Sequence, residues 1–114
     1  MPTQPKQKQL WIGLVEVRAL DSSSLILGDT KGAFTNIVTW ASSVEEYEGN
    51  ARLIIGELGG MYVSEFIDPE PLERRRTKRG GHLENEIEEM AARAEQNPNA
   101  IIYGTFHTYE SDDA

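Results

Sequence analysis

The amino-acid sequence predicts an α+β fold: a two-layer sandwich in which a mainly antiparallel sheet carries two helices on one face. Apolar residues alternate in several segments typical of β-strands, two further segments carry apolar stripes at helical spacing, and clusters of glycine, serine or proline separate them. In chain order the segments read strand, short strand, strand, helix, strand, uncertain segment, helix, strand. This order supports the α+β class.

Four segments are expected to form the main strands. Leu10–Arg18 carries apolar residues at both even and odd positions, which predicts a strand covered on both faces over part of its length. Gly32–Ala41 and Met61–Asp68 are the next two, and Leu25–Leu27 is the short strand between the first pair. Aromatic and β-branched residues predict the last strand at Ala100–Glu110.

The first predicted helix follows Ser42 and Ser43, which stand at capping-box spacing before Glu45 and Glu46. The glycine pair 59–60 ends it, because glycine readily adopts the left-handed conformation found after many helices. Its apolar stripe consists of Val44, Tyr47, Ala51, Ile54, Ile55 and Leu58.

The second predicted helix is marked by another apolar stripe and ends at Asn97 and Pro98. Glutamates crowd its first half, where the helix dipole favours negative charge. The stripe consists of Leu83, Ile87, Met90, Ala91 and Ala94.

The uncertain segment, Pro71–Arg75, decides between two topologies. If it pairs with Met61–Asp68 as a hairpin, Gly32–Glu110 forms the βαββαβ order of a ferredoxin-like fold with an extra N-terminal strand. The charge of this segment argues against that arrangement, because the corresponding strand lies at the centre of the ferredoxin-like sheet. Both topologies stay open at this point.

The domain limits follow from length and composition. The 114 residues fit one domain, expected at 9–110, with a flexible N-terminal tail at 1–8 and an acidic C-terminal tail at 111–114. The start of the chain lacks the apolar region of a secretory signal, and no apolar run is long enough to cross a bilayer. Because the chain has no cysteine, we expect neither disulfides nor an oxidising compartment, and cytoplasmic residence is the expectation.

The charge balance indicates what kind of partner the protein binds. The formal net charge is -8, so most of the surface repels nucleic acid and attracts a basic protein. We therefore expect a protein partner, with basic character, and neither nucleic acid nor a membrane. A second copy of the chain is also considered, because an uncovered sheet face bearing aromatic residues is a common docking surface.

The last predicted strand contains the candidate catalytic residues. On an unbroken strand Tyr103, His107 and Tyr109 share one face, so His107 could act as a general base with a tyrosine as hydrogen-bonding partner, and Glu65 could add a carboxylate. The alternative interpretation is an exposed strip of threonine, histidine and tyrosine without catalytic role. No triad or nucleophile-elbow motif accompanies the histidine.

No metal or cofactor site is predicted. The chain has two histidines, His82 and His107, on different predicted elements. Carboxylates near the C-terminus, at Glu110, Asp112 and Asp113, could join His107 but do not have the spacing of a calcium loop.

The most unusual local feature is a basic run in an otherwise acidic chain. The candidate anion-binding residues are Arg74, Arg75, Arg76, Lys78 and Arg79. They are followed by two glycines, an arrangement that can bind anions. Two observations weaken this interpretation: neighbouring glutamates can pair with the arginines, and no aromatic residue in the run can stack on bases. A surface loop is the alternative description.

Together these features favour a non-catalytic protein-binding module of regulatory or toxin-neutralising type, of the kind found among small bacterial proteins. Two alternatives remain open: a small-molecule or enzymatic site around His107, and an anion or nucleic-acid site on the Arg74–Arg79 run.

Overall fold

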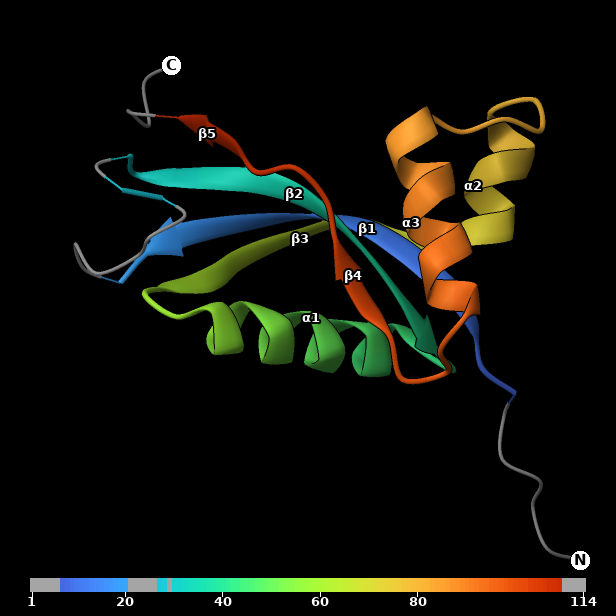
Figure 1. The fold of residues 1–114 in the computed structure, drawn as a ribbon, viewed down its shortest axis with the longest axis horizontal. Coiled ribbons are helices and arrows are strands. Elements are labelled where there is room, and N and C mark those ends of the chain that lie inside the picture. The colour runs from blue at the N-terminus through green and yellow to red at the C-terminus, as the bar shows by residue number, and fades with distance from the viewer. Residues whose placement is uncertain (1–6, 21–26, 29, 110–114) are drawn as a thin grey trace, which may run out of the picture.

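The computed structural model describes residues 7–20, 27–28 and 30–109, and its element order confirms the α+β class with a mainly antiparallel sheet (Figure 1). The elements are β1 (Gln9–Ala19), β2 (Gly32–Ala41), α1 (Val44–Leu58), β3 (Met61–Pro71), α2 (Leu72–Lys78), α3 (Asn85–Glu95), β4 (Ile101–Tyr103) and β5 (His107–Tyr109). Residues 25–26 of the expected short strand, residues 1–6 of the expected N-terminal tail and the whole of the expected C-terminal tail lie outside the described residues.

The sheet is built around the β1–β2 pair. The strand order is β3-β1-β2-β4, and β5 pairs with the other half of β2. Since β2 and β3 are both antiparallel to β1, they run parallel to each other with β1 between them, and α1 connects them. This arrangement is a split βαβ unit.

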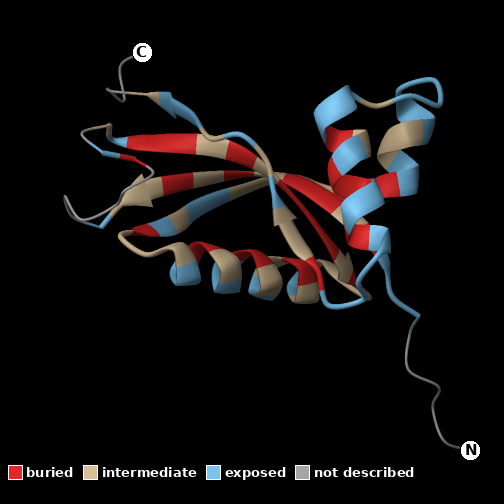
Figure 2. Ribbon diagram, in the orientation of Figure 1, coloured by how far each residue is buried: buried red, intermediate tan, exposed pale blue. Residues whose placement is uncertain are grey.

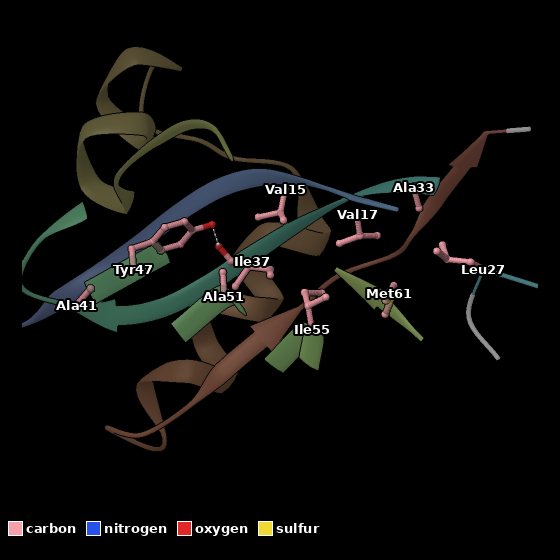
Figure 3. Packing of buried hydrophobic residues seen from close by; sticks show 10 residues of the cluster. All are labelled: Val15, Val17, Leu27, Ala33, Ile37, Ala41, Tyr47, Ala51, Ile55 and Met61. Atoms are coloured by element: carbon pink, nitrogen blue, oxygen red, sulfur yellow. Dashed lines mark hydrogen bonds between the residues drawn. The ribbon is translucent and has the colours of Figure 1, made fainter. Parts of the chain in front are cut away.

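The helix α1 covers one face of the sheet. Buried residues at odd positions of β1 and β2, among them Val15, Val17 and Ile37, form one core cluster with Tyr47, Ala51 and Ile55 of α1 (Figure 3). The helix begins as predicted, because the Ser43 side chain accepts a hydrogen bond from the Glu46 backbone N–H at 3.1 Å.

The helices α2 and α3 pack on the opposite face, as Figure 1 shows. Leu10 and Ile12 of β1 and Val38 of β2 form a second core cluster with the apolar residues of these two helices. The Trp40 indole N–H donates to the carbonyl of Ala94 in α3 at 2.8 Å.

The helices therefore do not share one face, in contrast to the expectation from the sequence. The physical reason is the composition of β1, whose first half is apolar at even and odd positions alike, so each face of the sheet needs its own cover.

The ferredoxin-like alternative is not supported, because its central hairpin does not form. Pro71 is the last residue of β3, and residues 72–78 are helical. Leucine, glutamate, arginine and lysine are good helix formers, and Leu72 is buried between helix and sheet.

The last predicted strand is interrupted. In β4 Tyr103 pairs with Ile37, and in β5 His107 pairs with Phe34, so four steps along this segment correspond to three steps along β2. A one-residue offset of this kind exchanges the faces to which alternate side chains point.

Among the described helices, none is long and apolar enough to cross a membrane.

Candidate functional site

Beyond the ends of α2 and α3, part of the sheet has no helix over it, and we call this part the open sheet face. Figure 1 shows these helices standing over one end of this side of the sheet, away from the tip of the β1–β2 pair. Strand register defines two rows of paired residues across it. The first row is Glu65, Glu16, Phe34 and His107, and the second is Tyr62, Arg18, Gly32 and Tyr109.

The Glu16 carboxylate is the centre of a hydrogen-bond network on the open sheet face. It accepts from the Tyr109 hydroxyl at 2.6 Å and from the Ser64 hydroxyl at 2.8 Å, and Arg18 lies 3.6 Å away. The Tyr109 hydrogen bond is the largest cause that holds the pKa of Glu16 below its usual value. The network ties three strands together and keeps a negative charge in the middle of the surface.

Aromatic residues give the same surface apolar area. The rings of Phe34 and Tyr109 are 5.6 Å apart, and Tyr62 is 44% exposed. Glycine is required at position 32, because a Cβ there would lie 2.5 Å from the Tyr109 hydroxyl oxygen. The open sheet face therefore combines aromatic rings with a carboxylate that is held in place by hydrogen bonds.

The four candidate catalytic residues do not converge. His107 is exposed and lies on the open sheet face with Tyr109, whose hydroxyl is held by Glu16. Tyr103 pairs with Ile37 on the α1 side, and its ring contacts Phe106. The grouping of Tyr103 with His107 on one face is thus wrong, because it assumed an unbroken strand.

Glu65 shares a row with His107 but lies across the sheet from it. Two strands separate β3 from β5 at this row, a distance of roughly 14 Å at the usual strand spacing. Side chains this far apart do not act on the same substrate atom, whereas a protein partner can contact both.

The basic run forms the helix α2, not a surface loop, and its side chains divide between two directions. Toward α3, Arg76 pairs with Glu88 at 2.7 Å, and it also pairs with Glu73 of its own helix. Toward the end of β3, the buried Glu70 accepts from Arg75 at 2.8 Å and from Lys78 at 2.9 Å. The hydrogen bond from Lys78 is the largest cause that lowers the pKa of Glu70. The hydrogen bond to Glu88 is the largest cause that raises the pKa of Arg76.

The sequence interpretation missed Glu16 and Glu70, the two carboxylates around which these networks are organised. Glu16 has a recognisable signal, since it stands between Val15 and Val17 in an otherwise apolar stretch. Glu70 has no such signal, because it lies between two prolines in a segment that also suits a turn.

No group of three or more metal-ligating side chains gathers among residues 7–20, 27–28 and 30–109. Comparisons with protein families, with curated proteins and with solved structures found no match to this chain.

Proposed function

We propose that this chain is a non-catalytic protein-binding module, of regulatory or toxin-neutralising type, that docks a basic protein on its open sheet face. The observation that carries the proposal is the unequal cover of the two sides of the sheet. The side facing α1 is buried at Val15 and Val17, whereas the opposite side beyond α3 presents Tyr62 and His107 to solvent.

Charge supports a basic partner. The chain has 19 acidic residues against 11 lysines and arginines. On the open sheet face the carboxylates Glu16 and Glu65 lie in one row, and Glu86 of α3 lies at its border through hydrogen bonds to Thr105. Such a surface accelerates association with a cationic protein and slows association with a second copy, which carries the same negative charge.

The spread of the functional groups supports docking over catalysis. The residues of each row extend across the sheet from β3 to β5, a width that suits a protein interface. An enzyme instead needs its catalytic groups within hydrogen-bond reach of one reacting atom. The lack of cysteine is compatible with action in the cytoplasm, which we include in the proposal.

The test is affinity capture from the native host, combined with a measurement of complex mass on the same sample. Two matched variants locate the interface. Tyr62→Lys changes an exposed residue of the open sheet face, and Leu53→Lys changes a residue of α1 that is 55% exposed. The same partner should be captured by the wild type and by Leu53→Lys, should be lost from Tyr62→Lys, and should bind more slowly at high salt.

Three outcomes would contradict the proposal. A partner that is lost with Leu53→Lys and kept with Tyr62→Lys would place the interface on α1. Recovery of the chain with itself alone would favour a homodimer. Self-copies that carry a co-purified metabolite would favour a small-molecule site around His107.

A further inference from the structure

A polar groove runs between α2 and the end of β3. Its volume is about 410 Å³, within the range of small-molecule sites. It contains four cationic side chains, two carboxylates and one proline, and it has no aromatic side chain on which a nucleic-acid base could stack. The lining residues are Asp68, Pro69, Glu70, Arg74, Arg75, Lys78 and Arg79.

Two of the cations are held in place by the protein. Glu70 is 8% exposed and accepts from both Arg75 and Lys78, and Arg75 also donates to the backbone carbonyl of Asp68 at 2.8 Å. One carboxylate therefore orients two positive charges along the groove, and the charge of the pair is not fully compensated.

The other two cations, Arg74 and Arg79, are exposed. Over residues 7–20, 27–28 and 30–109, the side chains of these two arginines form no hydrogen bond or ion pair. Each of them stands four residues from another cation of the groove: Arg74 is four residues before Lys78, and Arg79 is four residues after Arg75. Like charges at this spacing repel each other.

On the opposite side of α2, the cation is neutralised by carboxylates of the protein itself. There Arg76 is matched by Glu88 and Glu73. The groove has no comparable compensation for Arg74 and Arg79, and an added anion with several oxygens would supply it. Guanidinium groups match phosphate oxygens through two parallel hydrogen bonds.

We propose that this groove binds a phosphate group, with Arg74 and Arg79 contacting its oxygens and Arg75 and Lys78 adding positive charge from the wall. The group is inorganic phosphate or a small phosphomonoester. The net charge of -8 and the lack of aromatic residues in the groove disfavour a nucleic-acid strand. The proposal is independent of the partner bound on the open sheet face.

The experiment is calorimetric titration of the full chain with sodium phosphate, and separately with glycerol phosphate, at constant ionic strength. The groove variant is Arg74→Gln with Arg79→Gln. The control variant, Lys31→Gln with Arg93→Gln, removes the same charge at two exposed positions outside the groove. We expect saturable binding by the wild type and the control, and a loss of about tenfold or more in the groove variant.

Thermal unfolding provides a second readout that does not depend on heat signals. Phosphate should raise the Tm of the wild type and the control, and should leave that of the groove variant unchanged. Tighter binding of glycerol phosphate would identify an ester as the ligand, and equal binding would identify free phosphate. Either result supports the proposal.

Three results would overturn it: titration without saturation, an equal loss of affinity in the control variant, or binding of a single-stranded oligonucleotide that phosphate does not displace. The arginines of the groove variant have no partner among the described residues, so the variant should fold, and its unliganded Tm verifies this.

Discussion

The hydroxyl of Tyr109 donates a 2.6 Å hydrogen bond to the carboxylate of Glu16, joining β5 near the end of the chain to the first strand of the sheet. The two residues are 93 positions apart, and β2 lies between their strands. This contact helps to hold β5 beside Gly32 and Phe34 of β2, and the Glu16 carboxylate places a negative charge at the centre of the open sheet face.

Removing the Tyr109 hydroxyl should weaken the attachment of β5 to the rest of the sheet. Tyr109→Phe is expected to lower the free energy of unfolding by about 1.5 kcal/mol, the usual contribution of a hydrogen bond to a charged group. Tyr103→Phe is the control, because the Tyr103 hydroxyl forms no hydrogen bond within the described part of the chain. Urea denaturation of both variants at neutral pH measures the difference, and equal effects would contradict this role of Tyr109.

The same contact predicts how stability depends on pH. The pKa of Glu16 is lowered in the folded protein from the usual 4.5, so its ionised form adds stability above that pH. This contribution is lost as the pH falls through the lowered pKa. In Tyr109→Phe the acid-dependent loss should be smaller, since the largest cause of the shift is gone. Urea denaturation over a pH series would contradict this if the two curves ran parallel.

Replacement of a glycine by alanine should have opposite effects on stability at positions 13 and 49, and at position 13 the reason is a contact between β1 and α1. The buried hydroxyl of Tyr47 lies 3.1 Å from the Gly13 carbonyl oxygen and 3.0 Å from that of Ile37, and Figure 3 shows it pointing to Ile37. A Cβ at position 13 would lie 2.7 Å from that hydroxyl. Gly13→Ala should therefore destabilise the protein by about 1 to 3 kcal/mol.

Gly49→Ala is the matched control for this substitution. A Cβ at Gly49 meets nothing within 4 Å, and the residue is exposed in the middle of α1, so alanine should stabilise the helix by about 0.5 to 1 kcal/mol. The cost of Gly13→Ala should also be smaller in a Tyr47→Phe background, because the two changes share one contact. Additive effects in this double-mutant cycle would contradict the assigned contact.

The buried carboxylate of Glu70 should contribute more to the stability of the protein than the exposed carboxylate of Glu73. Glu70→Gln leaves Arg75, whose side chain is 13% exposed, without its ionic partner, and the expected loss of stability is about 2 kcal/mol. Glu73→Gln should cost less than about 0.5 kcal/mol, because that side chain is 73% exposed. Thermal unfolding compares the two, and a larger effect of Glu73→Gln would contradict the assignment.

Local patterns were sufficient to predict the class of the fold and two of its helices. The stripe from Val44 to Leu58 and the serine cap describe α1 closely, because amphipathic spacing and capping depend on neighbours in the sequence. The second stripe likewise corresponds to α3. The helical state of residues 72–78 was missed, since a short charged segment depends on the burial of one residue, Leu72.

The face on which each helix packs depends on contacts between distant segments. One signal was nevertheless present in β1, whose even positions change from Leu10, Ile12 and Leu14 to Glu16 and Arg18. This change marks where the cover by α2 and α3 ends. Figure 2 shows buried residues in the strands beneath these helices and also toward the tip of the β1–β2 pair, where Val15, Val17 and Ala33 pack on the α1 side.

The candidate site around His107 depended on an unbroken strand, and one inserted residue between β4 and β5 separates Tyr103 from it. Such an offset cannot be read from alternation alone, because the residues on both sides of it keep a regular pattern.

The central claim is that a basic protein docks on the open sheet face, and hydroxyl-radical footprinting of the captured complex tests it most directly. The side chains of Tyr62, Phe34 and His107 should become protected when the partner binds, while Leu53 on α1 should react as in the free protein. Protection of Leu53, with Tyr62 and His107 unchanged, would contradict the account.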